Sequence, residues 1–243
     1  MSTQRSRETG DRFTDRLHRL AESNWEAQFR HPFVQGVGRG TLDVEALKRW
    51  VRQDYLFLID YVRVFAYGAA RAPDLESMTR FVDLAQATVK GEMELHRAYA
   101  REFGITAEEL EAEVKEPVCR GYTDFLIRTA ATGSFAELVS ALLPCMWGFS
   151  EIGQRLAGQG LPADERYARW VQMYADPEFA ELAAWCRDLV DRAAQGQPPA
   201  ELQRMEAAFL ASSQYEYLFW EMAYRGPAAS GAPGTSGPGQ EQD

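Results

Sequence analysis

Cys145 lies in an apolar run of helical character, directly after Pro144 and one helical turn before Phe149. A proline inside a helix removes one backbone hydrogen bond and clashes with an earlier carbonyl, which costs about 3 kcal/mol. Chains tolerate such a proline mainly where a kink is wanted, so the sequence predicts a thiol at a kink in a buried helix. A single buried cysteine is usually an inert, small apolar side chain. A catalytic thiol therefore needs support from the rest of the chain.

Three other polar residues interrupt apolar helix faces. Asp54 shares its face with Phe57 at i+3, Tyr122 begins a second apolar run, and Glu216 is flanked by aromatic residues on both sides. A carboxylate in such surroundings must be paired, protonated or functional. The alternative is an ordinary hydrogen bond between helices, or a carboxylate that reaches solvent.

Glu92 and His96 are four residues apart and could be the carboxylate–histidine pair of a metal site. A di-iron site in a helical bundle needs two inward Glu-x-x-His units, and the sequence has no second one. We therefore expect no metal. Cys119 and Cys186 are expected to be structural thiols.

The apolar pattern is helical nearly throughout, and no strand-like alternation stands between turn signals. Thr106 and Ser134 each open a capping box, the second at the start of the Cys145 helix. We expect an all-α, single-domain helical bundle over residues 11–225, with a flexible N-terminus at 1–10 and a disordered Gly/Pro/Ser-rich tail at 226–243. The other expected helices span residues 12–30, 42–72, 74–103, 117–131, 165–174, 177–194 and 202–224.

The composition excludes several classes of partner. The 243 residues include 26 Lys and Arg against 36 Asp and Glu, a net charge of −10 with no basic patch. Nucleic acid and anionic membranes are therefore not expected as partners. No run approaches 18 apolar residues, and the polar N-terminus lacks a secretory signal. Three scattered cysteines indicate reduced thiols, so we expect a cytoplasmic protein.

Several segments together resemble the thiaminase II family, also called TenA, over residues 20 to 225. The Leu-Leu-Pro-Cys and Tyr-Glu-Tyr-x-Phe-Trp segments are the most specific of them. The matching segments begin at His31, Gly40, Gln53, Glu92, Tyr122, Gly133, Ala141 and Tyr215. The resemblance implies a haem-oxygenase-like fold that uses no haem, a homotetramer, and no cofactor. Cys145 places the chain in the branch of the family that carries the cysteine.

The resemblance also implies an activity. Family members hydrolyse 4-amino-5-aminomethyl-2-methylpyrimidine to ammonia and the 5-hydroxymethyl compound, which re-enters thiamin synthesis, and many also cleave thiamin. An electron-poor aminopyrimidine suits a soft nucleophile, so Cys145 would add to a ring carbon and form a covalent adduct. Glu216 would relay protons between thiol, ring nitrogen and leaving amine, and Asp54 would accept hydrogen bonds from the exocyclic amine.

The remaining site residues expected from the resemblance are aromatic. Tyr122 and Tyr174 would hydrogen-bond around the nucleophile and the leaving group, and Phe219 would close the apolar wall. Phe57 and Phe149 would face the two sides of the ring. Some relatives carry tyrosine where this chain has Phe57, and many carry it where this chain has Phe149. Each phenylalanine keeps a flat surface but lacks the hydroxyl.

Three alternatives stay open. The first is a related pyrimidine hydrolase with an altered substrate, which Phe57 and Phe149 suggest. The second is a non-catalytic pyrimidine-binding or regulatory protein, against which Cys145, Glu216 and Asp54 speak. The third is a metal- or haem-dependent oxygenase, because haem oxygenases place a histidine ligand on the first helix, where this chain has His18.

Overall fold

The computed structural model describes residues 12–226. The expected N-terminus at 1–10 and the expected tail after residue 226 lie outside the described residues. The described chain is helical, with no β-strand among residues 12–226. Its elements are α1 (Phe13–Phe29), α2 (Pro32–Arg39), α3 (Val44–Arg71), α4 (Leu75–Ala87), η1 (Thr88–Glu92), α5 (Met93–Glu102), α6 (Ala107–Glu111), α7 (Pro117–Thr132), α8 (Phe135–Ala157), α9 (Glu165–Ala175), α10 (Pro177–Ala194) and α11 (Pro199–Arg225).

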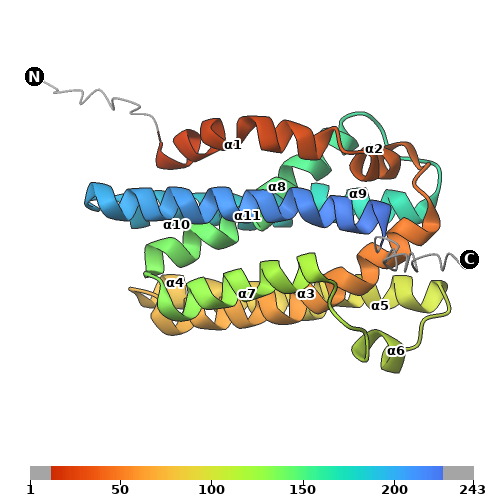
Figure 1. Ribbon diagram of the computed structural model, residues 1–243, viewed down its shortest axis with the longest axis horizontal. Helices are drawn as coiled ribbons and strands as arrows, with labels where there is room; N and C mark the ends of the chain where they lie inside the picture. Colours follow the sequence, from red (N-terminus) through yellow and green to blue (C-terminus); the bar gives the residue numbers. More distant parts are fainter. Residues whose placement is uncertain (1–11, 227–243) are drawn as a thin grey trace, which may run out of the picture.

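The long helices run side by side in a bundle (Figure 1). The helix α8 packs against α9, α10 and α11, while α3 packs against α4, α7 and α11. The helix α1 lies along α11 on the opposite side from α3. With 28 residues, α3 is about 42 Å long and reaches nearly from end to end of the bundle. The core between these helices contains Trp50, Trp170 and Trp220, all fully buried.

The helix α8 is the centre of the core. It is long and apolar enough to cross a membrane by length and composition, with a mean hydropathy of 1.2, but 67% of that window is buried inside the protein. This is the pattern of a core helix. Pro144 lies inside the helix, and the Ser134 capping box begins it as expected. The Thr106 capping box at α6 is also confirmed.

Two elements differ from the sequence prediction. The short helix α2 was missed, because Pro32 was interpreted only as the end of the preceding helix. A proline at the first helical position also begins a helix, and the His31 side chain caps this one by accepting a hydrogen bond from the Phe33 amide. The expected single helix at 74–103 is interrupted by η1, a π-helical turn that ends at Glu92.

Helices α8 and α9 meet without a side chain between them at Gly153. A Cβ atom there would lie 2.4 Å from the Tyr174 carbonyl carbon, so only glycine permits this approach. Gly153 is two helical turns after Cys145 on α8. The contact therefore fixes the backbone of Tyr174 relative to the helix that carries the thiol.

Candidate active site

Cys145 lies on α8 and is the most exposed of the three cysteine residues. It is partly accessible, whereas Cys119 and Cys186 are buried. The Tyr61 hydroxyl and the Glu216 carboxylate both lie close enough to the Cys145 thiol to influence its pKa. The Tyr61 hydroxyl also donates to the Leu142 carbonyl of α8, at 2.7 Å.

The free site favours the neutral thiol. Burial raises the pKa of Cys145 well above its ordinary value, and the nearby Glu216, Glu92 and Asp54 raise it further. A thiolate must therefore form by proton transfer to a neighbouring base once substrate is in place.

Glu216 is the candidate base for this proton transfer, because its raised pKa makes it a stronger base than an ordinary carboxylate. Burial raises its pKa to about 8, although a hydrogen bond from Tyr122 opposes the shift. The Tyr122 hydroxyl lies 2.6 Å from Glu216 Oε1 and 2.7 Å from Ser212 Oγ. Ser212 precedes Glu216 by one turn of α11. The Tyr122 hydroxyl is thus held between two groups of one helix, and it orients the carboxylate beside the thiol.

Asp54 on α3 faces a buried histidine. Its Oδ2 lies 2.8 Å from His96 Nε2, which is close enough for an ion pair. The two groups are not aligned as a hydrogen bond. His96 Nδ1 lies 2.8 Å from the backbone carbonyl of Glu92, which can only accept, so Nδ1 donates. Burial opposes charging of His96, but Asp54 and Glu92 outweigh it and raise the pKa of the imidazole.

A third carboxylate, Glu92, stands at the end of η1. The Tyr174 hydroxyl donates to its Oε1 at 2.6 Å. Burial, with repulsion from Asp54, raises the pKa of Glu92 to about 7. The Glu92 residue is partly accessible, because it lines a cavity beside η1.

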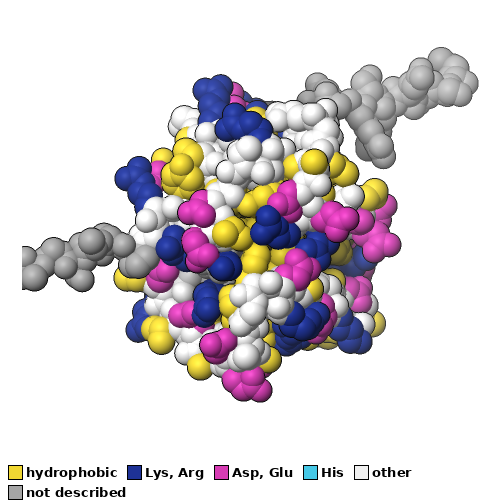
Figure 2. Space-filling view, turned by 90° about the vertical axis from the view of Figure 1, so that its right-hand side faces the viewer, with side chains coloured by type: hydrophobic (Ala, Val, Ile, Leu, Met, Phe, Trp, Pro, Cys, Tyr) yellow, Lys and Arg dark blue, Asp and Glu magenta, His cyan; other side chains and the backbone are white. Residues whose placement is uncertain are grey.

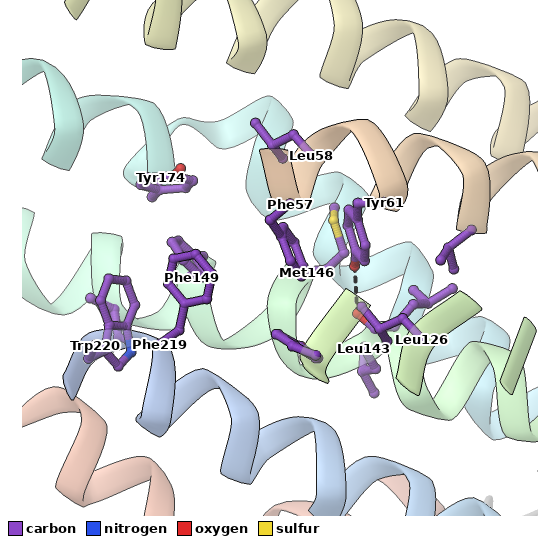
Figure 3. Close-up of a cluster of buried hydrophobic side chains, with 14 of the residues drawn as sticks. Phe57, Leu58, Tyr61, Leu126, Leu143, Met146, Phe149, Tyr174, Phe219 and Trp220 are labelled. Atoms are coloured by element: carbon purple, nitrogen blue, oxygen red, sulfur yellow. Dashed lines mark hydrogen bonds between the residues drawn. The ribbon is translucent and has the colours of Figure 1, made fainter. Parts of the chain in front are cut away.

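The aromatic side chains form two groups around these acids. The Phe57 ring lies 5.0 Å from Tyr122 and 5.9 Å from Phe219, measured between ring centroids. The Phe149 ring lies 4.7 Å from Tyr174 and 5.1 Å from Trp220. Figure 3 shows Phe57, Phe149 and Phe219 in one buried cluster, contributed by α3, α8 and α11.

The structure thus brings together the residues that the sequence singled out, although their catalytic and binding roles stay predictions. It adds four more: Tyr61, Glu92, His96 and Ser212. Tyr61 and Ser212 each stand one helical turn from an expected site residue, a spacing that could have indicated them. The pairing of Glu92 and His96 was seen in the sequence but interpreted only as a candidate metal motif.

The ring of His18 packs against side chains of neighbouring helices. Its ring lies 4.7 Å from Trp25 and 5.1 Å from Trp147, and its Nε2 lies 3.5 Å from a Glu151 oxygen. These neighbours are aromatic rings and a carboxylate of the protein itself. His18 is therefore a partly exposed histidine packed at a helix interface.

Charged side chains of both signs are mixed over the face shown in Figure 2. No single-sign patch of the kind that attracts a nucleic-acid backbone is seen on this face.

Known proteins resemble this chain over most of its length. Over 213 residues, the chain is 43% identical to a protein of Halalkalibacterium halodurans named aminopyrimidine aminohydrolase, covering 87% of this chain and 95% of the relative. A Bacillus subtilis protein of the same name is 36% identical, with 88% and 90% covered.

Two solved structures share the fold of this chain. A TenA family transcription regulator from a Silicibacter species matches with a TM-score of 0.81 and 29% identity, covering 88% of this chain and 97% of that one. A Shewanella denitrificans domain with a heme oxygenase-like fold matches with a TM-score of 0.68 at 12% identity, covering 87% and 91%. The second likeness shows the fold alone. The TENA/THI-4/PQQC family model matches residues 18–226, so the chain belongs to this family.

Proposed function

We propose that the protein is an aminopyrimidine aminohydrolase (thiaminase II) that acts in thiamin salvage. It converts 4-amino-5-aminomethyl-2-methylpyrimidine and water to the 5-hydroxymethyl compound and ammonia. The observation that carries the proposal is the buried Cys145 thiol beside the Glu216 carboxylate, in a chain 43% identical to a protein of that name. The reaction uses no metal and no cofactor.

The reaction begins at the thiol. Glu216 accepts the Cys145 proton, the thiolate adds to a ring carbon next to a ring nitrogen, and the π pair of their C=N bond moves to that nitrogen, which takes the proton from Glu216. The methylene that carries the departing nitrogen is attached to the neighbouring ring carbon. The bond from this methylene to nitrogen breaks, and its electron pair goes to nitrogen, which leaves as ammonia. Water then adds to the exocyclic methylene and gives up one proton. The ring nitrogen finally loses its proton, the C=N bond forms again, and the C–S bond breaks to release the thiolate.

The other residues bind the ring. Asp54 accepts hydrogen bonds from the exocyclic amine, and His96 holds the carboxylate in place. Phe57 and Phe149 cover the two faces of the ring, Phe219 closes the apolar wall, and Tyr122 and Tyr174 orient the two glutamates.

The test is incubation of purified protein with the aminomethyl pyrimidine and, separately, with thiamin, following ammonia and released thiazole. We expect ammonia from the first substrate. Tight binding of the pyrimidine without turnover would instead favour a binding or regulatory protein, a role that the name of the Silicibacter relative suggests for that protein. Turnover of neither compound, with turnover of another aminopyrimidine, would favour an altered substrate.

We also expect a homotetramer in the cytoplasm. An uncovered apolar stripe on α4 supports an oligomer, because Leu75, Met78 and Val82 share one helix face and are 75%, 41% and 54% exposed. Light scattering measures the mass directly. Val82→Glu should lower it if this stripe is a subunit contact, and an unchanged tetramer would place the contact elsewhere.

A further inference from the structure

A cavity of about 290 Å³ reaches the candidate site from outside the bundle. It lies between the α4–η1 segment and the first turns of α10, with apolar walls that include Leu84, Phe179 and Leu182. Met146 and Glu92 also line it. Met146 adjoins Cys145 in the chain and packs in the same buried cluster as Phe57 and Tyr61 (Figure 3). The cavity therefore meets the site on the side of Glu92.

Glu92 has one carboxylate oxygen free for a ligand. Oε1 accepts the hydrogen bond from Tyr174, and within residues 12–226 Oε2 receives no hydrogen bond. Gly91, the residue before it, also lines the cavity, and a Cβ atom there would meet nothing within 4 Å. The π-turn thus presents a carboxylate beside open space.

The two glutamates face different parts of the site. Glu216 interacts with the thiol and is bonded by Tyr122, whereas Glu92 is bonded by Tyr174 and opens on the cavity. No Lys or Arg is found among the described residues that line the cavity, while Asp176 and Glu178 stand at its rim. A departing group that carries positive charge matches this lining.

We propose that Glu92 is the substrate-binding carboxylate for the departing amine, which it holds as an ammonium ion beside this cavity. The inference rests on the proposed function and assigns a second acid to the same site. A primary aliphatic amine is an ammonium ion at neutral pH. Burial without a charged partner would lower its pKa, so that the amine would become neutral. Paired with Glu92, the nitrogen keeps three hydrogens, so it leaves as neutral ammonia when it takes the electron pair of the breaking bond. No proton has to be supplied to it in that step.

The test compares two leaving groups. The thiazolium nitrogen of thiamin is quaternary, has no N–H bond, and leaves as a neutral ring without any proton. Glu92→Gln should therefore lower kcat/KM by about tenfold to a hundredfold for the aminomethyl pyrimidine, the range for a lost charged hydrogen bond, and far less for thiamin. Glu216→Gln should lower both, because both substrates need the thiolate. Equal losses for both substrates in Glu92→Gln would overturn the proposal.

A binding measurement tests the assignment without turnover. In a Cys145→Ser background, Glu92→Gln should weaken the aminomethyl compound by about tenfold and leave the uncharged hydroxymethyl compound unchanged. Glu94→Gln removes the same charge at an exposed site two residues away and should change neither. Equal affinity for the aminomethyl compound with and without Glu92 would contradict an ammonium site.

The two failures can be told apart. If the wild-type protein hydrolyses neither compound, the proposed function falls, while the binding comparison still decides whether Glu92 recognises an ammonium group. If the wild type is active and Glu92→Gln equals it on both substrates, the proposed function stands and the role of Glu92 is wrong.

Discussion

The imidazole of His96 ties the carboxylate of Asp54 to the π-turn, with Asp54 Oδ2 2.8 Å from His96 Nε2. The other ring nitrogen donates to the Glu92 carbonyl, and the ring packs on Trp50 at 4.8 Å between centroids. The histidine is fully buried. The position of Asp54 on α3 and that of Glu92 on η1 are therefore set by one side chain.

Asp54→Asn should weaken binding of the hydroxymethyl pyrimidine by about tenfold to a hundredfold. The amide would present a donor either to His96 or to the exocyclic amine, and a mismatched buried pair costs about 1–3 kcal/mol. Calorimetry on both proteins measures the difference, with the exposed Asp124→Asn on α7 as control. Unchanged affinity would make Asp54 a structural contact between helices.

Cys145→Ser should fold normally and lose nearly all turnover, because a hydroxyl is far less ionised than a thiol. The matched control is Cys186→Ser, which changes a cysteine that is buried away from the site acids. Steady-state release of ammonia compares the three proteins. Near-normal activity of Cys145→Ser would remove covalent catalysis by this residue.

Glu216 should control how activity and stability depend on pH. With a pKa of about 8, it is protonated in the free enzyme at neutral pH, so kcat/KM should rise with pH and level off above about 8. Glu216→Gln should lower kcat much more than it raises KM, and it should remove this limb of the profile. A change confined to KM would make Glu216 a binding residue.

The same shift has a stability consequence of definite sign. The folded pKa lies above the unfolded value of about 4.3, so the folded protein binds the proton more tightly. The stabilising contribution is complete below pH 4.3 and is lost as the pH rises through 8. The melting temperature of wild type should fall relative to Glu216→Gln between pH 5 and pH 9, and parallel profiles would show that the carboxyl is not shifted.

Phe149→Tyr adds the hydroxyl that the resemblance to the family leads us to expect at this position. The ring lies against Tyr174 and Trp220, so stacking should be retained. If the missing hydroxyl limits catalysis, kcat for the aminomethyl substrate should rise. If the site has adapted to another pyrimidine, activity should fall, because a buried hydroxyl is left without a partner. A variant equal to wild type on every pyrimidine would place Phe149 out of contact with substrate.

Gly91→Leu should fill the cavity beside Glu92 without straining the helix, since its Cβ meets nothing within 4 Å. The bulky thiazole of thiamin should then leave more slowly, by about tenfold to a hundredfold, the range for crowding a packed site, whereas ammonia still passes. Gly148→Leu adds the same side chain at another open glycine, outside this cavity, and should change neither rate. Equal losses on both substrates would show a general disturbance of η1.

Helix periodicity and capping residues predicted most of the fold. The expected helix at 42–72 is α3, and both capping boxes form, because these signals depend on residues within one or two turns. The π-turn could not be predicted, since one extra residue leaves the apolar spacing on either side nearly unchanged. Pro32 shows a different limit, because the same residue ends one helix and begins the next.

The site was only partly visible in the sequence. Cys145, Asp54 and Glu216 are polar residues on apolar faces, and the resemblance to a family selected them. The bond between Tyr174 and Glu92 joins residues 82 positions apart, and no local pattern indicates it. It depends on the close approach of α9 to α8 at Gly153 and on the π-turn, both of which are tertiary features.

The π-turn also bears on where the bundle opens first. Its i→i+5 geometry is rare in proteins and stands between two ordinary α-helical segments. Amide hydrogens of residues 88–92 should exchange with solvent sooner than those of α4 and α5, as in a small unit that opens locally. Such opening would widen the passage beside Glu92 while the helices around Cys145 stay closed. We therefore expect the helix that carries Cys145 to stay closed while η1, which carries the Glu92 carboxylate, opens locally.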